Sequence, residues 1–260
     1  MFIDFHTHCF PEKIAEKAMD KLSFTAGIKP TTDGTLKGLL ISMEESGIDK
    51  SVVLSIATNE KQQRSVNDFA ASVNGSRVIA FGSVYPDAPN ALDELERIKE
   101  LGLKGVKFHP EYQNFYIDDE KMKPIYKKIS ELGLITVFHA GADYGYPPPY
   151  HATPDRIERA LKWFDAPVVA AHWGGLDYGE GVIKYLCGLP IYIDTSYGYG
   201  CMSKYTAQTI IEKHGTEKIL FASDSPWHKP KWERFMIETL SLTQSEKEQI
   251  YYKNAIKLLK

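Results

Sequence analysis

Residues 2–8 read Phe-Ile-Asp-Phe-His-Thr-His, an apolar run that ends in two histidines one residue apart. The run predicts a short β-strand. Because strand side chains alternate between two faces, His6 and His8 point to the same side and Thr7 to the other. Two neighbouring imidazoles can hold one cation, and histidine is the commonest metal ligand. An isolated His-x-His is equally compatible with an ordinary strand, so its meaning depends on the rest of the chain.

Similar apolar runs recur along the chain, separated by sequence with helical periodicity. We predict strands at residues 2–5, 51–56, 78–83, 105–108, 135–138, 168–171, 191–194 and 219–222. They are apolar on both faces, which is typical of a parallel sheet covered on both sides. The helical patterns at 36–46, 91–101 and 122–132 each stop before a glycine, the usual helix-ending residue. Further helices are predicted from Thr153-Pro154 and at 202–213 and 232–240.

Eight strands that each precede helical sequence predict a single-domain α/β fold, a (β/α)8 or TIM barrel, over residues 1–260. The structural alternative is an open, doubly wound sheet, but no Gly-x-Gly-x-x-Gly loop supports it. We expect residues 9–33 to form an insertion that covers the barrel mouth. Residues 244–260 should form an amphipathic C-terminal helix on the barrel exterior. Loops 141–150 and 198–200 are candidate lids over the mouth.

The composition excludes several classes of function. With 43% hydrophobic and 25% charged residues, the 260-residue chain is ordinary for a globular protein. A net charge of −3 gives no support for nucleic-acid binding. The sequence shows no secretory signal and no apolar run near 18 residues, so we expect a cytoplasmic protein without a membrane partner. The three distant cysteines favour free thiols. We expect a small-molecule substrate and leave a homodimer open.

Polar residues stand at the ends of several later strands. His109, His139 and His172 follow the fourth, fifth and sixth predicted strands, and Asp224 follows the eighth. In barrel enzymes the carboxyl-terminal strand ends carry the chemistry. We therefore expect these side chains to converge with His6 and His8 on one face of the barrel. Such a convergence favours a metal site over incidental histidines.

Several segments together carry a family resemblance: residues 4–8 (Asp-Phe-His-Thr-His), 105–110 (Gly-Val-Lys-Phe-His-Pro), His139, His172, 224–226 (Asp-Ser-Pro) and 254–259. The chain resembles the amidohydrolase superfamily, specifically the amidohydrolase-related branch that includes aminocarboxymuconate-semialdehyde decarboxylase. The resemblance implies one divalent metal held by His6, His8, His139 and Asp224. It also implies that His172 is a catalytic acid or base beside the metal.

The chemistry of these residues agrees with that implication. Neutral imidazoles and a carboxylate suit Zn²⁺ first, with Mn²⁺, Fe²⁺ or Ni²⁺ as alternatives. Asp224 would both touch the metal and accept a proton from an activated water, with His172 as its catalytic partner. In binuclear members of the superfamily a lysine on the fourth strand bridges two metals. We interpret Lys107 as structural or substrate-facing, with the bridging role as its alternative.

Other residues near the predicted mouth are candidates for binding substrate. They are His109, Glu111, Tyr150, Trp173 and Trp227. A structural role for His109 is equally compatible with the sequence, and aromatic residues at a barrel mouth often only pack.

Two reactions suit this site. The leading hypothesis is hydrolysis of a C–N or C–O bond in a small amide, cyclic amide, lactone or ester. The alternative is non-oxidative decarboxylation of an unsaturated or aromatic carboxylic acid. Decarboxylation needs a cationic group for the substrate carboxylate, and no arginine can be placed at the mouth from sequence. A non-catalytic metal-binding barrel is a third reading, from a different class.

Overall fold

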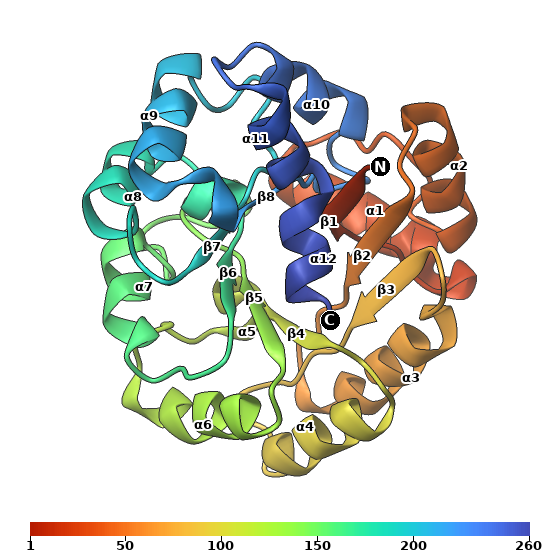
Figure 1. Cartoon of the computed structure of the whole chain (residues 1–260). Coiled ribbons are helices and arrows are strands. Elements are labelled where there is room, and N and C mark those ends of the chain that lie inside the picture. Colours follow the sequence, from red (N-terminus) through yellow and green to blue (C-terminus); the bar gives the residue numbers. More distant parts are fainter.

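The computed structural model describes all 260 residues and shows eight parallel strands arranged around a barrel (Figure 1). Two sheets, of order β1-β2-β3 and β4-β5-β6-β7-β8, make up the wall. Single bridges between Gly82 and Val106 and between Thr7 and Ser225 close its two seams. The predicted (β/α)8 barrel is confirmed, and the open sheet is excluded. The strands are β1 Ile3–Thr7, β2 Lys50–Leu54, β3 Val78–Phe81, β4 Gly105–Phe108, β5 Ile135–Phe138, β6 Val168–Ala170, β7 Tyr192–Asp194 and β8 Ile219–Leu220.

Helices surround the strands, and local signals set where they begin and end. Helix α2 starts after Thr35, whose side chain accepts a hydrogen bond from the Gly38 N–H, and it ends at Gly47 with φ of 67°. The helices that lie between consecutive strands or follow the last strand are α1 Glu12–Ala26, α2 Leu36–Ser46, α3 Gln63–Val73, α4 Ala91–Glu100, α5 Pro110–Gln113, α6 Lys123–Glu131, α7 Pro154–Leu161, α8 Gly179–Tyr185, α9 Lys204–His214 and α10 Pro230–Glu238. Short 3₁₀ turns cover 60–62, 120–122, 172–174 and 216–218.

Two apolar clusters form the core. One fills the barrel interior with strand residues such as Ile3, Phe5, Val52 and Val137. The larger one joins the outer faces of the strands to the surrounding helices. This arrangement buries the strands on both faces, which explains why their sequences are continuously apolar.

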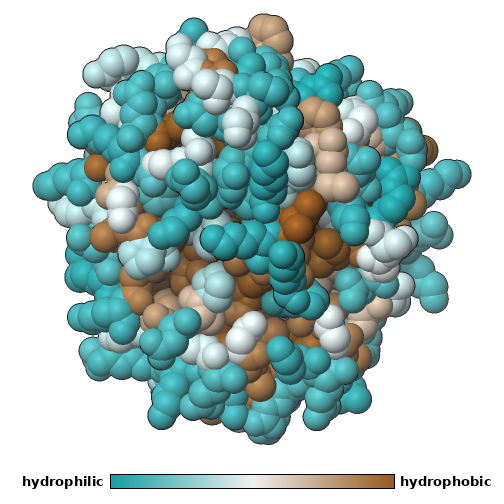
Figure 2. All heavy atoms as spheres, in the orientation of Figure 1, coloured by the Kyte–Doolittle hydropathy of each residue, from teal (hydrophilic) through white to brown (hydrophobic).

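The C-terminal segment lies across the amino-terminal end of the barrel (Figure 1). It consists of α11 Gln244–Glu248, a π-helical turn Gln249–Lys253 and α12 Asn254–Leu258. Ala255 packs into the barrel-interior cluster, so the segment closes that end in addition to lying outside the strands. Within this segment Tyr251 is buried, whereas Ile256 is exposed. Figure 2 shows this face, with hydrophilic residues around its rim and apolar residues toward its middle.

Residues 9–33, which include α1, lie at the opposite end. The backbone N–H and the hydroxyl of Thr31 both donate to the carbonyl of Pro226, just after β8. Thr25 packs close to Gly145 in the loop after β5. The segment therefore contacts two loops of the barrel mouth. None of the helices is long and apolar enough to cross a membrane.

Candidate metal centre

The first strand delivers its histidines to the barrel axis through an irregularity. The register of β1 against β2 shifts between Asp4 and Thr7. Strict alternation would put His6 on the opposite face from Ile3 and Phe5, which line the barrel interior. Irregularities of this kind re-aim side chains. His6 accordingly reaches side chains of β4, β7 and the loop after β8.

Three potential ligand atoms form a compact cluster at this end of the barrel. Nε2 of His6 and Nε2 of His8 are 3.1 Å apart. Oδ1 of Asp224 lies 3.4 Å from the first nitrogen and 3.1 Å from the second. Ligand atoms bonded to a tetrahedral Zn²⁺ lie about 3.4 Å from one another. The spacing therefore fits a single cation.

The remaining ring nitrogens show which form these histidines take. Nδ1 of His6 donates to Oδ2 of Asp194, and Nδ1 of His8 donates to the carbonyl of Leu54, both at 2.8 Å. These acceptors leave the Nε2 lone pairs free to face Asp224. Burial, reinforced by the positive charge of Lys107, lowers the pKa of His6 well below its usual value, so its ring is neutral. Two imidazole lone pairs and a carboxylate oxygen in contact fit a divalent metal and leave it an open coordination position.

Lys107 of β4 brings a positive charge to the cluster. Its Nζ lies 3.3 Å from Nε2 of His6, and the side chain is only 1% exposed. Burial lowers the pKa of Lys107 to about 8, while Asp194 and Asp224 act in the opposite direction. The amine thus keeps most of its charge at neutral pH. A buried cation stands directly beside the candidate metal ligands.

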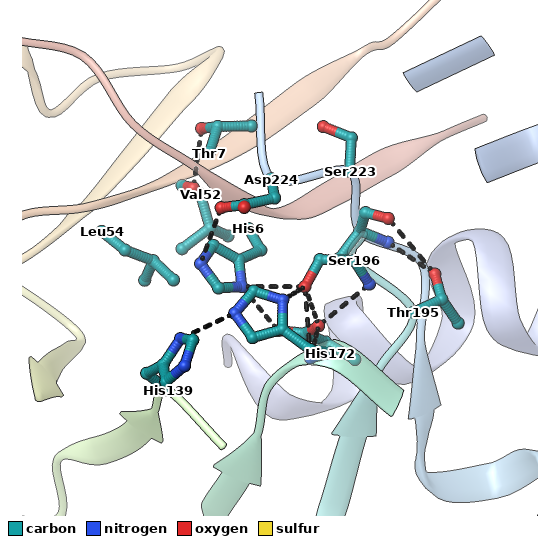
Figure 3. A network of polar contacts seen from close by, with 12 residues as sticks. His6, Thr7, Val52, Leu54, His139, His172, Thr195, Ser196, Ser223 and Asp224 are labelled. Carbon is teal, nitrogen blue, oxygen red and sulfur yellow. Dashed lines mark hydrogen bonds and ion pairs between the residues drawn. The ribbon is translucent and has the colours of Figure 1, made fainter. Parts of the chain in front are cut away.

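His172 belongs to a hydrogen-bond network next to the cluster (Figure 3). Its Nδ1 is 2.9 Å from the Ser196 hydroxyl, which also lies 3.2 Å from Nδ1 of His6 and contacts Oδ1 of Asp194 at 2.5 Å. Asp194 also accepts a hydrogen bond from the backbone N–H of His172. One buried carboxylate therefore orients both His6 and His172, and this fixed geometry suits an acid or base beside the metal.

His139 is the predicted ligand that the structure does not bring into the cluster. Its Nε2 donates to the carbonyl of Ala142 at 2.9 Å, and its Nδ1 faces Nε2 of His172 at 3.0 Å (Figure 3). Its ring also stacks on His109, with centroids 4.1 Å apart, and Nε2 of His109 is 3.2 Å from Oδ2 of Asp143. Three of the four predicted ligands converge, and the role of His139 as the fourth stays a prediction.

The backbone is held in an uncommon conformation at three strand ends. The φ angles of His172, Trp173, Tyr197 and Asp224 lie between 56° and 69°. For residues other than glycine such angles cost of order 1–3 kcal/mol each and concentrate at functional sites. The strain at these strand ends agrees with the placement of a reactive centre there.

The family relationship rests on the whole sequence. The sequence profile of the Amidohydro_2 family, described as Amidohydrolase, matches residues 3–260. The chain belongs to the amidohydrolase family. The predicted resemblance is thereby confirmed, and with it an enzyme for which a divalent metal is expected. Comparison with curated proteins found no match.

Solved structures resemble this amidohydrolase over its full length. An uncharacterised TIM-barrel protein from Bordetella bronchiseptica has a TM-score of 0.78 at 18% identity, covering 99% of this chain and 98% of that one. A 2,6-dihydroxybenzoate decarboxylase from Rhizobium has 0.73 at 18%, covering 99% and 98%. A dihydroxybenzoic acid decarboxylase from Polaromonas sp. JS666, with bound manganese and the inhibitor 2-nitroresorcinol, has 0.74 at 18%, covering 99% and 96%. At these identities the likeness shows the shared barrel.

The predicted substrate-binding residues of this amidohydrolase lie in different surroundings. His109 and Glu111 lie in the polar region beside His139, where Glu111 accepts a hydrogen bond from the backbone of His151. Trp227 is half-buried and lies three residues after Asp224. Trp173 is 1% exposed and packs in the larger apolar cluster, and its contact with substrate stays a prediction. Tyr150 packs against Tyr178.

Several polar residues of the site were missed from the sequence. Asp194 is the last residue of the seventh predicted strand and Ser196 lies two residues later, so the search of strand ends that found the histidines would also have found them. Asp143, His228 and Glu233 lie in loops or a helix, where no motif marks them. Cys9 proves to be a buried packing residue, and burial raises the pKa of its thiol to about 12.

Proposed function

We propose that this amidohydrolase is a metal-dependent, non-oxidative decarboxylase of a small unsaturated or aromatic carboxylic acid. The observation that carries the proposal is the buried ammonium of Lys107, 3.3 Å from Nε2 of His6. Decarboxylation needs a cation for the substrate carboxylate, and the sequence offered no arginine for it. Lys107 supplies that charge beside the metal ligands. The similar proteins from Rhizobium and Polaromonas are both decarboxylases, which supports the same choice.

His6, His8 and Asp224 would hold the metal, with His139 as a candidate fourth ligand. The two-histidine, one-carboxylate set suits Zn²⁺, and the manganese of the Polaromonas structure makes Mn²⁺ the second candidate. A bound divalent cation supplies Lewis acidity toward a substrate oxygen. Near-complete burial of the surrounding side chains keeps bulk water away and strengthens these charge interactions.

His172 is the proposed proton donor. Burial, reinforced by His139 and His6, lowers its pKa well below the usual value, so the free enzyme holds a neutral ring. An anionic substrate placed beside it would raise that pKa and favour protonation. The bond between the carboxyl carbon and its neighbour then breaks, CO₂ leaves, and a proton from the His172 ring takes its place on the neighbouring carbon. Ser196 and Asp194 would keep the ring oriented during this transfer.

Hydrolysis of an amide, lactone or ester is the second candidate, and the position of Asp224 favours it. Oδ1 of Asp224 lies within 3.4 Å of both clustered histidines, where a carboxylate can act as general base toward an activated water. The sequence alone favoured this reaction because no arginine could be placed at the mouth to hold a carboxylate. Lys107 can provide the cationic group that decarboxylation needs.

The test is a substrate panel with Zn²⁺-loaded and Mn²⁺-loaded enzyme. Aromatic and unsaturated acids, beginning with 2,6-dihydroxybenzoate, are assayed for CO₂ release, and amides, lactones and esters for acid release. The proposal expects metal-dependent CO₂ release that Asp224→Asn abolishes. Acid release from an amide, lactone or ester, without CO₂ from any acid in the panel, would overturn it in favour of hydrolysis.

A further inference from the structure

A second polar arrangement lies on the β7–β8 side of the mouth, and the proposed reaction does not use it. The Glu233 carboxylate of α10 is 1% exposed. Its Oε2 accepts hydrogen bonds from the backbone N–H groups of Gly198 and Tyr199, both at 3.0 Å. Its Oε1 lies 2.6 Å from Nδ1 of His228. A buried carboxylate needs donors of this kind, and here they tie the loop after β7 to the loop after β8.

This carboxylate fixes the orientation of the His228 ring. Because Nδ1 donates to Glu233, Nε2 faces the other way and remains available to a ligand. The ring face stacks on Tyr197 with centroids 4.0 Å apart, and the ring edge meets Trp232 at 5.5 Å. The side chain of His228 is still 12% exposed. An imidazole whose orientation is fixed and whose side chain is still accessible is suited to bind a ligand.

His228 also lies close to the proposed reaction centre. Its backbone N–H and that of Trp227 both donate to the carbonyl of Asp224, so it belongs to the same turn as a candidate metal ligand. Tyr197, whose φ is 57°, lies between His228 and His172, with its ring 6.4 Å from that of His172. Lys107 is on β4, on the opposite side of the closed barrel from β8. The mouth thus offers the Lys107 cation beside His6 and, in the turn that follows Asp224, an oriented imidazole.

We propose that His228, positioned by Glu233, binds a second oxygen substituent of the substrate, on the side away from the carboxylate that Lys107 holds. This inference rests on the proposed function and narrows its substrate class to carboxylic acids that carry an additional hydroxyl or carboxyl group. A hydrogen bond from a positioned imidazole to such an oxygen changes binding by about tenfold. Glu233 acts through His228 and is a positioning residue.

The experiment compares two probes that differ in one hydroxyl on the ring position opposite the carboxylate, 4-hydroxybenzoate and benzoate. Their dissociation constants are measured by calorimetry on the Mn²⁺-loaded wild type and on the variants His228→Gln and Glu233→Gln. His214→Gln is the matched control, because His214 is also half-buried but bonds only the backbone of Ile191 and Gly188. We expect the wild type and the control to prefer 4-hydroxybenzoate by about tenfold. The preference should fall to about twofold in His228→Gln and to an intermediate value in Glu233→Gln.

A merely structural role would weaken both probes equally and leave the preference unchanged, and that result would overturn the inference. So would a wild-type protein that binds both probes equally or neither. If His228→Gln does not fold, the Glu233→Gln variant is used in its place, since it keeps the imidazole and an amide oxygen as acceptor. A preference unchanged from the wild type would then overturn the inference. Because these are binding measurements, a clear preference without any CO₂ release would contradict the decarboxylase proposal and leave the role of His228 standing.

Discussion

Replacement of Lys107 by methionine separates a substrate-holding lysine from a structural one. Methionine has a similar length but no charge, so the change removes the cation that lies 3.3 Å from Nε2 of His6. Loss of one partner from a buried charged contact costs about 2–5 kcal/mol. That corresponds to a decrease of roughly 30-fold or more in kcat/KM for decarboxylation. Metal binding should be retained, because the variant removes a positive charge that repels the divalent ion.

The assay combines CO₂ release, metal content and a thermal melt of the same preparations. Lys121→Met is the matched control, since Lys121 is 45% exposed and pairs only with Asp87 at the surface. We expect full activity in the control, and loss of turnover with unchanged metal content in Lys107→Met. The reasoning would be refuted by a Lys107→Met enzyme that keeps its activity within about threefold. It would also be refuted by one that loses its metal, because Lys107 would then take part in metal binding.

Three further predictions concern the proton donor, the C-terminal segment and the thiols. His172→Asn should lower kcat by about 10²- to 10⁴-fold with metal content unchanged, and loss of metal instead would make His172 a ligand. Ala255→Asp, which places a carboxylate against the barrel interior, should lower the free energy of unfolding by about 3 kcal/mol in urea titrations. Ile256→Asp, on the exposed side of the same helix, should change it by less than about 0.5 kcal/mol, and equal effects would contradict the described packing. In native protein at pH 8 the exposed Cys201 should react with a thiol reagent, whereas Cys9, whose pKa is raised to about 12, should react only after unfolding.

Strand positions could be predicted from sequence because each strand is buried on both faces and therefore reads as a short apolar run. The predicted ranges 105–108 and 135–138 coincide with β4 and β5. The convergence of His6, His8 and Asp224 also followed, since all parallel strands deliver their ends to one side of the barrel. That much of the site depends on chain topology, and topology leaves a clear pattern in the sequence.

Side-chain orientation left no such pattern. His139 stands where the strand-end rule puts it, but its ring bonds Ala142 and His172. Likewise, the burial of Trp173 depends on a backbone turn in which its φ is 58°. No local sequence pattern predicts this turn. The approach of Lys107 to His6 depends on the register shift in β1. These contacts are set by tertiary packing, and the approach of Lys107 to His6 is the one on which the proposed decarboxylation rests.

The claim that His6, His8 and Asp224 hold one catalytic metal is tested most directly by counting bound Mn²⁺. Electron paramagnetic resonance detects the free ion during titration of metal-free protein, which gives both stoichiometry and affinity. We expect one Mn²⁺ per chain in the wild type, binding at least tenfold weaker in His8→Asn and Asp224→Asn, and unchanged binding in His109→Asn. Two ions per chain, or unaltered affinity after loss of Asp224, would contradict the account.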